Sequence, residues 1–420
     1  MRVLIVNTSE RTGGAALAAN RLLMALNNNG VKARMLVRDK STDDLLVSQW
    51  GDGWRGQWNF LRERLAVWWR LRLGRKHLWD LDVGCAGSDI TRTREFQEAD
   101  VVHLHWVNQG MLSLNNIRRI LDSGKRVVWT MHDMWPATAL CHLTLTCRQF
   151  TTGCCHCPYL PGGGSENDAA AAAWRRKQSM LEGHQITFVA CSQWLAGEAR
   201  QSALLKGQRV VSIPNAIDTT VFHPADRRAM RQQLGLPAEK KLIAFVSQRA
   251  TNPYKGMDYL AEACRLLGET HPQLAKETGL VVLGGHAEEV AKAFQMPVFA
   301  QGYVNDAHRI AALYSACDLF VLPSLSENLP NTIMEAMACG VPCVGFRTGG
   351  IPEMIDHKKN GYVANYRDAD DLARGLAWVL SEADAGALAS EAQRKVARCW
   401  SQGSVAKRYI EVYEGKDDEP

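Results

Sequence analysis

The stretch "DLFVLPSLSENLPNTIMEAMACGVPCVGF" (residues 318–346) has the order strand, loop, helix, strand. Residues 318–324 and 342–346 are apolar runs of strand length. Between them, Asn331 is expected to cap a helix that ends at Gly340. This order predicts a parallel sheet whose strands are joined by helices, with the loop before the helix at the carboxyl edge of the sheet.

The rest of the chain repeats this alternation, with helical patterns such as 256–269 between most apolar runs. The predicted strands are 2–6, 31–37, 100–106, 126–132, 186–192, 209–215, 241–247, 280–285, 318–324 and 342–346. Two such series indicate an α/β protein with two doubly wound, Rossmann-like domains. The expected domains are 1–214 and 215–399, and residues 400–420, with a last helix, follow the second domain.

The overall composition is that of a globular protein. The chain has 420 residues, of which 46% are hydrophobic and 22% are charged, and this length favours two domains. The apolar run in the opening "MRVLIVN" is too short for a secretory signal, and no run reaches the roughly 18 apolar residues of a membrane span. We therefore expect a cytoplasmic protein.

Positive charge is concentrated near the N-terminus. Residues 1–190 contain 24 Lys and Arg against 17 Asp and Glu, and within them residues 54–79 contain seven basic residues, one acid and five tryptophans. Basic, Trp-rich helices suit anionic membrane surfaces, so peripheral membrane contact is predicted. The alternative is an amphipathic helical hairpin packed on its own domain. Nucleic acid is not an expected partner, because no recognised binding module surrounds this segment.

Two loops that follow predicted strands are suited to phosphate groups. Gly13 and Gly14 allow an anion to approach the start of a helix, although their spacing disfavours a nicotinamide dinucleotide. Arg249 and Lys255 follow the strand at 241–247, and two converging cations suit a diphosphate. The alternatives are a plain strand–helix turn and two solvated surface charges.

The loop and helix after 318–324 offer two carboxylates. Glu327 could accept hydrogen bonds from sugar hydroxyls, and Glu335, one turn inside the helix, could bind a ribose. Backbone N–H groups at the helix start would point at the ligand between them. The predicted donor-binding residues of this segment are Glu327, Asn328, Leu329, Pro330, Asn331, Thr332 and Glu335.

Histidines mark the ends of two strands in the first half. His132 and Asp133 end the strand at 126–132 and are expected to face a cleft between the domains. A neutral imidazole there could bond the transferred sugar or its departing phosphate. The alternative is a histidine whose partners lie within its own loop. His103 and His105 are expected within or at the end of a strand.

Together these stretches resemble a family 4 retaining glycosyltransferase with the GT-B fold, in which two Rossmann-like domains face each other across a cleft. The resemblance rests on "SENLPNTIMEAMACGVPCVGFRTGGIPEMI" (326–355), "SQRATNPYKG" (247–256), "IPNAID" (213–218) and the Gly–Gly loop. It covers most of the chain and is strongest over 210–365. It also implies a last helix, around 405–415, that crosses back to the N-terminal domain.

The resemblance assigns roles to the donor-binding residues. It implies that Arg249 and Lys255 hold the nucleotide diphosphate, that Glu327 contacts the hydroxyls of the donor sugar, and that Glu335 contacts the ribose. His132 would lie near the anomeric carbon. The catalytic set is then His132, Glu327, Arg249 and Lys255, and the Gly13–Gly14 loop would approach the phosphates or the acceptor.

The implied reaction is transfer of a hexosyl group from a nucleotide-sugar donor, with retention and without a metal ion or other cofactor. The expected acceptor is a lipid-linked saccharide in the biosynthesis of a cell-surface polysaccharide or lipopolysaccharide. A non-catalytic nucleotide-sugar-binding protein and a sugar-nucleotide epimerase of related fold are the alternatives.

Five of the twelve cysteines fall in "CHLTLTCRQFTTGCCHCP" (141–158). Cys154 and Cys157 form a C-x-x-C pair, with Cys141 and Cys147 upstream. Four thiolates at this spacing could hold a structural zinc ion. A redox pair or plain buried thiols are the alternatives.

Overall fold

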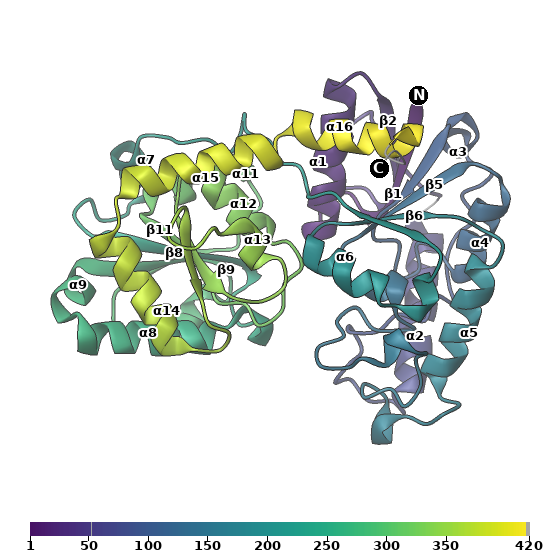
Figure 1. The fold of residues 1–420 in the computed structure, drawn as a ribbon, viewed down its shortest axis with the longest axis horizontal. Helices are drawn as coiled ribbons and strands as arrows, with labels where there is room; N and C mark the ends of the chain where they lie inside the picture. Colours follow the sequence, from purple (N-terminus) through teal and green to yellow (C-terminus); the bar gives the residue numbers. More distant parts are fainter. Residues whose placement is uncertain (52, 417–420) are drawn as a thin grey trace. The chain divides into compact units, whose positions relative to one another are not determined.

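The computed structural model describes residues 1–51 and 53–416, which form two compact units (Figure 1). Unit 1 comprises Met1–Asn215 together with the chain from Val405 onward, and unit 2 comprises Ala216–Ser404. Each unit is built around one parallel sheet with helices between its strands. The prediction of an α/β protein with two Rossmann-like sheets is confirmed.

Unit 1 contains a seven-stranded parallel sheet in the order β3-β2-β1-β4-β5-β6-β7. Its strands are β1 (Arg2–Ser9), β2 (Lys32–Asp39), β3 (Val47–Gln49), β4 (Val101–Leu104), β5 (Arg126–Met131), β6 (Thr187–Ala190) and β7 (Arg209–Ser212). Its α-helices are α1 (Gly14–Asn28), α2 (Gly53–Arg70), α3 (Arg94–Glu98), α4 (Leu114–Asp122), α5 (Ala169–Leu181), α6 (Gln193–Arg200) and α16 (Gln402–Glu414). Short 3-10 turns are η1 (Trp135–Ala137), η2 (Gln149–Thr151), η3 (Pro161–Gly163) and η4 (Ala203–Leu205).

Unit 2 contains a six-stranded parallel sheet in the order β10-β9-β8-β11-β12-β13. Its strands are β8 (Lys241–Arg249), β9 (Thr278–Gly285), β10 (Val298–Gly302), β11 (Leu319–Leu322), β12 (Cys343–Phe346) and β13 (Gly361–Ala364). Its helices are α7 (Arg227–Leu234), η5 (Pro253–Lys255), α8 (Met257–Thr270), α9 (Pro272–Glu277), α10 (Ala287–Ala291), α11 (Ala307–Ala316), α12 (Asn331–Ala338), α13 (Ile351–Met354), α14 (Ala369–Ala377), the π-helical η6 (Trp378–Glu382) and α15 (Ala385–Cys399).

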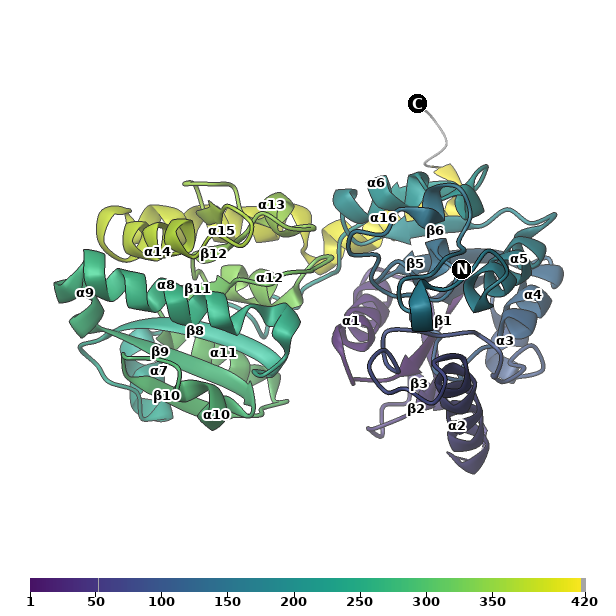
Figure 2. The ribbon, with the colours of Figure 1, turned by 90° about the horizontal axis from the view of Figure 1, so that it is seen from below.

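The central strands of unit 2 are buried on both faces. Ile243 and Phe245 of β8 belong to a core cluster that includes residues of α8 and α14. Leu242 and Ala244 alternate with them and are equally buried, so helices cover the second face too. Figure 2 shows α8 and α11 on opposite sides of β8. The carboxyl edge of the sheet is therefore the place where polar loops can meet a ligand.

The chain end returns to unit 1, as predicted. In α16 the Tyr413 hydroxyl lies 2.7 Å from Nδ1 of His103, and the Tyr409 hydroxyl lies 2.9 Å from Oγ1 of Thr130. The Arg126 guanidinium donates to the carbonyl oxygen of Tyr413 (2.8 Å). The strands β4 and β5 of the sheet are thus bonded to a helix nearly 300 residues later in the sequence.

The helical hairpin that was the alternative interpretation of 54–79 does not form. The segment is one helix, α2, followed by turns over residues 71–80. Across residues 1–51 and 53–416, none of the helices combines the length and the apolar character needed to cross a bilayer.

Candidate functional site

Lys255 is positioned at the end of β11 by a turn that requires glycine. It closes η5, whose start is capped by the side chain of Asn252. The next residue, Gly256, has a φ of 72°, and a Cβ there would overlap the carbonyl oxygen of Pro323. This close approach holds η5 against the residue that follows β11 and fixes where the Lys255 side chain begins.

Lys255 and Glu327 form an ion pair in unit 2. The Lys255 ammonium donates to Oε1 of Glu327, and the Ser324 hydroxyl donates to the same oxygen (3.0 Å). The two charged side chains are 27% and 13% exposed, so the pair is partly shielded from water but open on one side. The Gly350 N–H donates to the carbonyl oxygen of Asn328 (2.8 Å) and ties the loop down. Two predicted donor-site residues therefore meet directly.

Arg249 is the last residue of β8, at the carboxyl edge of the sheet. Its side chain is exposed, and its Nε donates to Oγ1 of Thr251 (3.0 Å). Arg249 and Lys255 thus both belong to the loop that leaves β8. That they hold a diphosphate stays a prediction.

The prediction that Asn331 caps α12 is wrong. Pro330, with φ −68° and ψ 115°, is the N-cap residue, and Asn331 is the first residue of the helix. The pyrrolidine ring fixes φ near this value, and the helix begins one residue earlier than a cap at Asn331 would give. Proline has no side-chain acceptor, so this end of α12 offers backbone N–H groups and no capping side chain. Donor contacts by Leu329 and Thr332, on either side, stay predictions.

Glu335 lies in the second turn of α12 and is 6% exposed. The Tyr314 hydroxyl of α11 donates to its Oε2 (3.3 Å). Burial and the neighbouring carboxylate raise the pKa of Tyr314 well above its usual value, so this hydroxyl remains a donor. Glu335 is therefore held by a neighbouring helix, whereas Lys255 and Glu327 hold each other.

In unit 1 the Gly13–Gly14 loop opens α1. Gly13 is the N-cap residue with a φ of 90°, a conformation that favours glycine. Before it, the buried Glu10 carboxylate accepts hydrogen bonds from the backbone of Ser41 (2.6 Å) and Thr42 (2.9 Å). Burial raises the pKa of Glu10, but these hydrogen bonds outweigh it and the pKa is lowered. A charged carboxylate therefore anchors the loop to the chain after β2.

His132 directly follows β5 and pairs with a second histidine. Its Nε2 lies 2.9 Å from Nδ1 of His105, and Sγ of Cys191 lies 3.5 Å from its Nδ1. Burial lowers the pKa of His132 to about 4 and that of His105 well below its usual value. Both rings are neutral at pH 7, so one donates to the other. Both nitrogens of His132 thus have protein partners, but these partners follow β4 and β6 and do not lie in its own loop, as the alternative interpretation expected. Contact with a sugar stays a prediction.

Asp133 is part of a buried charge network that the sequence did not reveal. His142 bridges Oδ2 of Asp133 and Oδ2 of Asp82, each at 2.8 Å, and Arg64 pairs with Asp82. Asp133 also accepts from the Trp106 indole (2.9 Å). Burial lowers the pKa of His142, but the two carboxylates overcome it and raise the pKa to about 10. His142 is therefore a cation at neutral pH, and it holds Asp133 in place.

The cysteine segment does not provide the predicted zinc site. Within the described part of the chain, no three His, Cys, Asp or Glu side chains are arranged so that they could hold a metal ion. The predicted ligands are Cys141, Cys147, Cys154 and Cys157. Burial raises the pKa of Cys141 and of Cys154 to about 12, so both are thiols.

Two parallel α/β units of this topology are the architecture of the GT-B fold. The pattern described as "Glycosyltransferase Family 4" matches residues 12–221, and the pattern described as "Glycosyl transferases group 1" matches residues 226–396. The chain belongs to glycosyltransferase family 4.

Solved structures share this fold at low sequence identity. Sucrose-phosphate synthase from Thermosynechococcus elongatus aligns over 99% of both chains with a TM-score of 0.67 and 16% identity. Anabaena HepE in complex with UDP and glucose aligns over 99% of this chain and 100% of that chain, with a TM-score of 0.63 and 17% identity. Both comparisons establish the fold alone.

Among curated proteins, a D-inositol 3-phosphate glycosyltransferase from Stackebrandtia nassauensis is 31% identical over 186 residues. This stretch covers 42% of this chain and 42% of the relative. The chain thus spans at most about half of the length of the curated relatives it matches.

Proposed function

We propose that the protein is a retaining glycosyltransferase that moves a hexosyl group from a nucleotide-sugar donor to a saccharide acceptor. The observation that carries this proposal is the contact between Lys255 and Glu327 at the carboxyl ends of β8 and β11. In a nucleotide sugar the diphosphate lies next to the sugar hydroxyls. A cation could bind the diphosphate while the adjacent carboxylate accepts hydrogen bonds from the hydroxyls. In the free protein the two side chains neutralise each other, and donor binding replaces each partner with a group of the ligand.

In the proposed reaction, the bond between the anomeric carbon and the diphosphate oxygen breaks, and its electron pair goes to the diphosphate. The acceptor hydroxyl oxygen forms the new bond on the same face of the sugar and gives its proton to the departing phosphate. Arg249, Lys255 and the N–H groups at the start of α12 stabilise the charge that develops on the leaving group. No metal ion takes part in this step.

We further propose a lipid-linked saccharide of a surface polysaccharide or lipopolysaccharide as acceptor, with His132 and the Gly13–Gly14 loop on the acceptor side. The curated relatives carry the name D-inositol 3-phosphate glycosyltransferase, which favours an inositol phosphate as the second candidate. A panel that contains both classes of acceptor separates them.

The test is a thermal-shift screen of nucleotide sugars, followed by an assay of free nucleotide with the best binder. A glycosyltransferase releases nucleotide in proportion to acceptor and gives a product of retained anomeric configuration. An epimerase converts the donor sugar without acceptor, and a binding protein does neither. Either result would overturn the proposal.

A further inference from the structure

Helix α2 has its polar residues inside and its apolar residues outside. Its buried residues are Gly56, Asn59, Glu63, Arg64 and Val67. Its exposed large apolar residues are Trp54 (64%), Trp58 (55%), Leu61 (45%), Leu65 (47%) and Trp69 (74%). A helix on the surface of a globular protein normally has the opposite distribution. The exposed side of α2 is therefore suited to a further apolar environment.

The inward side of α2 is fixed by polar contacts. The Glu63 carboxylate accepts hydrogen bonds from four successive backbone N–H groups, at distances of 2.6 to 3.1 Å; they belong to Val83, Gly84, Cys85 and Ala86. Arg64 donates to the carbonyl oxygen of Leu78 (2.6 Å) and pairs with Asp82. Rotation of the helix to bury its tryptophans would leave these charges buried without partners. The polar contacts of Glu63 and Arg64 therefore keep the apolar side chains of α2 directed toward the solvent.

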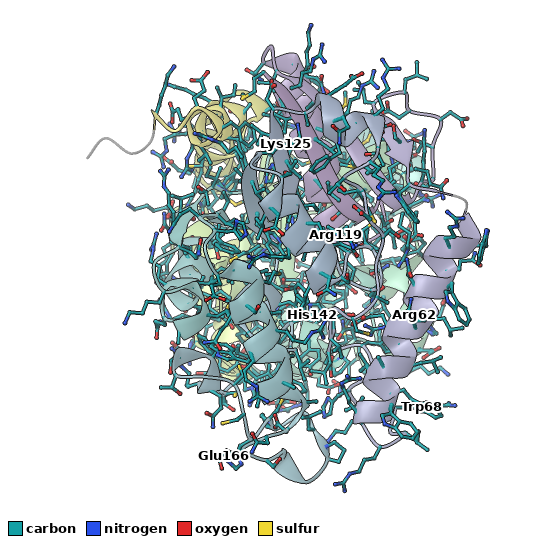
Figure 3. The ribbon with its side chains drawn as sticks, turned by 90° about the vertical axis from the view of Figure 1, so that its right-hand side faces the viewer. Arg62, Trp68, Arg119, Lys125, His142 and Glu166 are labelled. Carbon is teal, nitrogen blue, oxygen red and sulfur yellow. The ribbon has the colours of Figure 1, made fainter. Side chains whose placement is uncertain are left out.

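The exposed apolar residues form one continuous stripe. They are three or four positions apart along the helix, so they lie above one another on the same side. Exposed cations accompany the stripe in α2 and in the turns that follow it: Arg55, Arg62, Arg72, Arg75 and Lys76. The only acid in residues 53–79 is Glu63, which is buried. In Figure 3, α2 runs along the edge of the view, with Arg62 and Trp68 labelled on it.

A cavity of about 470 Å³ lies at the N-terminal end of this stripe. Its walls include three indoles and three guanidinium groups, from Trp50, Trp54, Trp58, Arg55, Arg92 and Arg119. Among the described lining residues Asp89 is the one carboxylate, and it pairs with Arg119 (2.8 Å). A concave site with excess positive charge and aromatic walls suits a phosphate ester that carries an organic group. Trp54 and Trp58 belong to both the stripe and the cavity.

We propose that this α2 surface, the stripe with its five cations and the adjoining cavity, docks on an anionic phospholipid bilayer. The indole and leucine side chains would enter the interface, the cations would lie near lipid phosphates, and the cavity would take one phosphate headgroup. A second copy of the chain is a poorer occupant, because a two-fold contact would place these cations against themselves. The docking does not depend on the proposed reaction.

The test is co-sedimentation of the full chain with vesicles of phosphatidylcholine, alone or mixed with phosphatidylglycerol. We expect binding to the anionic vesicles at low salt that high salt weakens by about tenfold or more. An apolar variant combines Leu61→Ser, Leu65→Ser and Trp69→Ser, and a charge variant replaces the five cations with glutamine. Each should lose about tenfold or more in vesicle affinity at unchanged thermal stability.

Matched controls carry changes of the same kind elsewhere. Leu45→Ser alters a 92% exposed apolar residue of unit 1. A second control replaces five exposed cations of unit 2 with glutamine: Arg228, Lys276, Lys292, Lys359 and Arg394. Both controls should bind vesicles like the wild type. Equal loss in the controls would overturn the assignment to α2. So would absence of vesicle binding together with an oligomer that the apolar variant dissociates, which would identify a second copy as the occupant.

The cavity is tested separately with soluble short-chain phosphatidylglycerol and with inorganic phosphate. We expect the short-chain lipid to raise the melting temperature of the wild type, and Arg92→Gln with Arg55→Gln to abolish that shift. Inorganic phosphate at the same concentration should give no shift. An equal shift with phosphate alone would overturn the assignment of the cavity to a lipid headgroup.

Discussion

Lys255 is held in a fixed position by its backbone turn, and it is also one of the residues proposed to stabilise the leaving diphosphate. Its backbone is fixed by η5, and its ammonium is already paired with Glu327 before any ligand arrives. A partly shielded cation of this kind stabilises a leaving group more than a fully solvated one, because less water competes with it.

Lys255→Ala should lower kcat for nucleotide release by about 10²- to 10³-fold, the loss usual for one group that stabilises developing charge. The donor-induced thermal shift should also shrink. Lys359→Ala removes another exposed cation of unit 2 and is the matched control, with rates like the wild type. Wild-type turnover by the Lys255 variant would exclude this lysine from the reaction.

His142 allows a prediction for the dependence of stability on pH. Its pKa is about 10 in the folded protein, against about 6.5 in an unfolded chain, so the folded state binds the proton more tightly. The stability that its ion pairs contribute is complete below about pH 6.5 and is lost as the pH rises toward 10. His142→Gln should therefore cost about 3 kcal/mol of unfolding free energy near pH 6. Urea unfolding at several pH values should show the difference between the two proteins shrinking as the pH rises; a constant difference would contradict the charged state of His142.

The sequence predicted candidate site residues that lie close together in one loop. It did not predict residues that are brought together from distant segments of the chain. Arg249 and Lys255 are six positions apart, and the strand before them places both at one edge. His142, in contrast, meets Asp82 from a segment 60 residues away. No periodicity links two such positions, because a turn after β5 and the chain that leaves α2 bring them together.

At the level of elements, the placement of η5 depends on one close contact between backbones. Gly256→Ala adds a methyl group that overlaps the Pro323 carbonyl oxygen, in addition to the strain of a positive φ. The control is Gly302→Ala, since Gly302 has a φ of 65° and no atom within 4 Å of an added Cβ. The control should lose about 1 kcal/mol, and Gly256→Ala at least about 2 kcal/mol more. Denaturant unfolding measures both; equal losses would show that φ alone matters at Gly256.

Every central strand of the two sheets was predicted, and of the four edge strands only β7 was. The three that were missed, β3, β10 and β13, are all edge strands of their sheets. An edge strand has one neighbouring strand and more contact with water, so its sequence is shorter or less apolar than that of a central strand. In β10, for example, every residue is only partly buried. The hydrophobic pattern therefore identifies the centre of a sheet better than its margins.

At the scale of the whole molecule, the chain end is part of the fold of unit 1. Tyr413 and Tyr409 of α16 give hydrogen-bond partners to His103 and Thr130, which are almost fully buried. Burial lowers the pKa of His103 to about 3, so the ring is neutral and needs these polar partners. Without α16, His103 and Thr130 would keep only the bond between Nε2 and Oγ1 (2.7 Å) and would lose the tyrosine partners and their apolar cover.

A chain that ends at Ser404 should therefore keep unit 2 folded and destabilise unit 1. Each buried polar group left without its partner costs about 1–3 kcal/mol, and the lost burial of Val405, Tyr409 and Tyr413 adds about 1.5–3 kcal/mol for each side chain. Such a sum is comparable with the whole stability of a domain. Differential scanning calorimetry should then show the transition of unit 2 near its wild-type temperature, with that of unit 1 shifted far down or absent. Tyr303→Phe, which changes a tyrosine of unit 2 that is 61% exposed, should leave both transitions in place. If the shortened chain melts like the full one, α16 does not stabilise unit 1, and the bond between His103 and Thr130 is sufficient for both side chains.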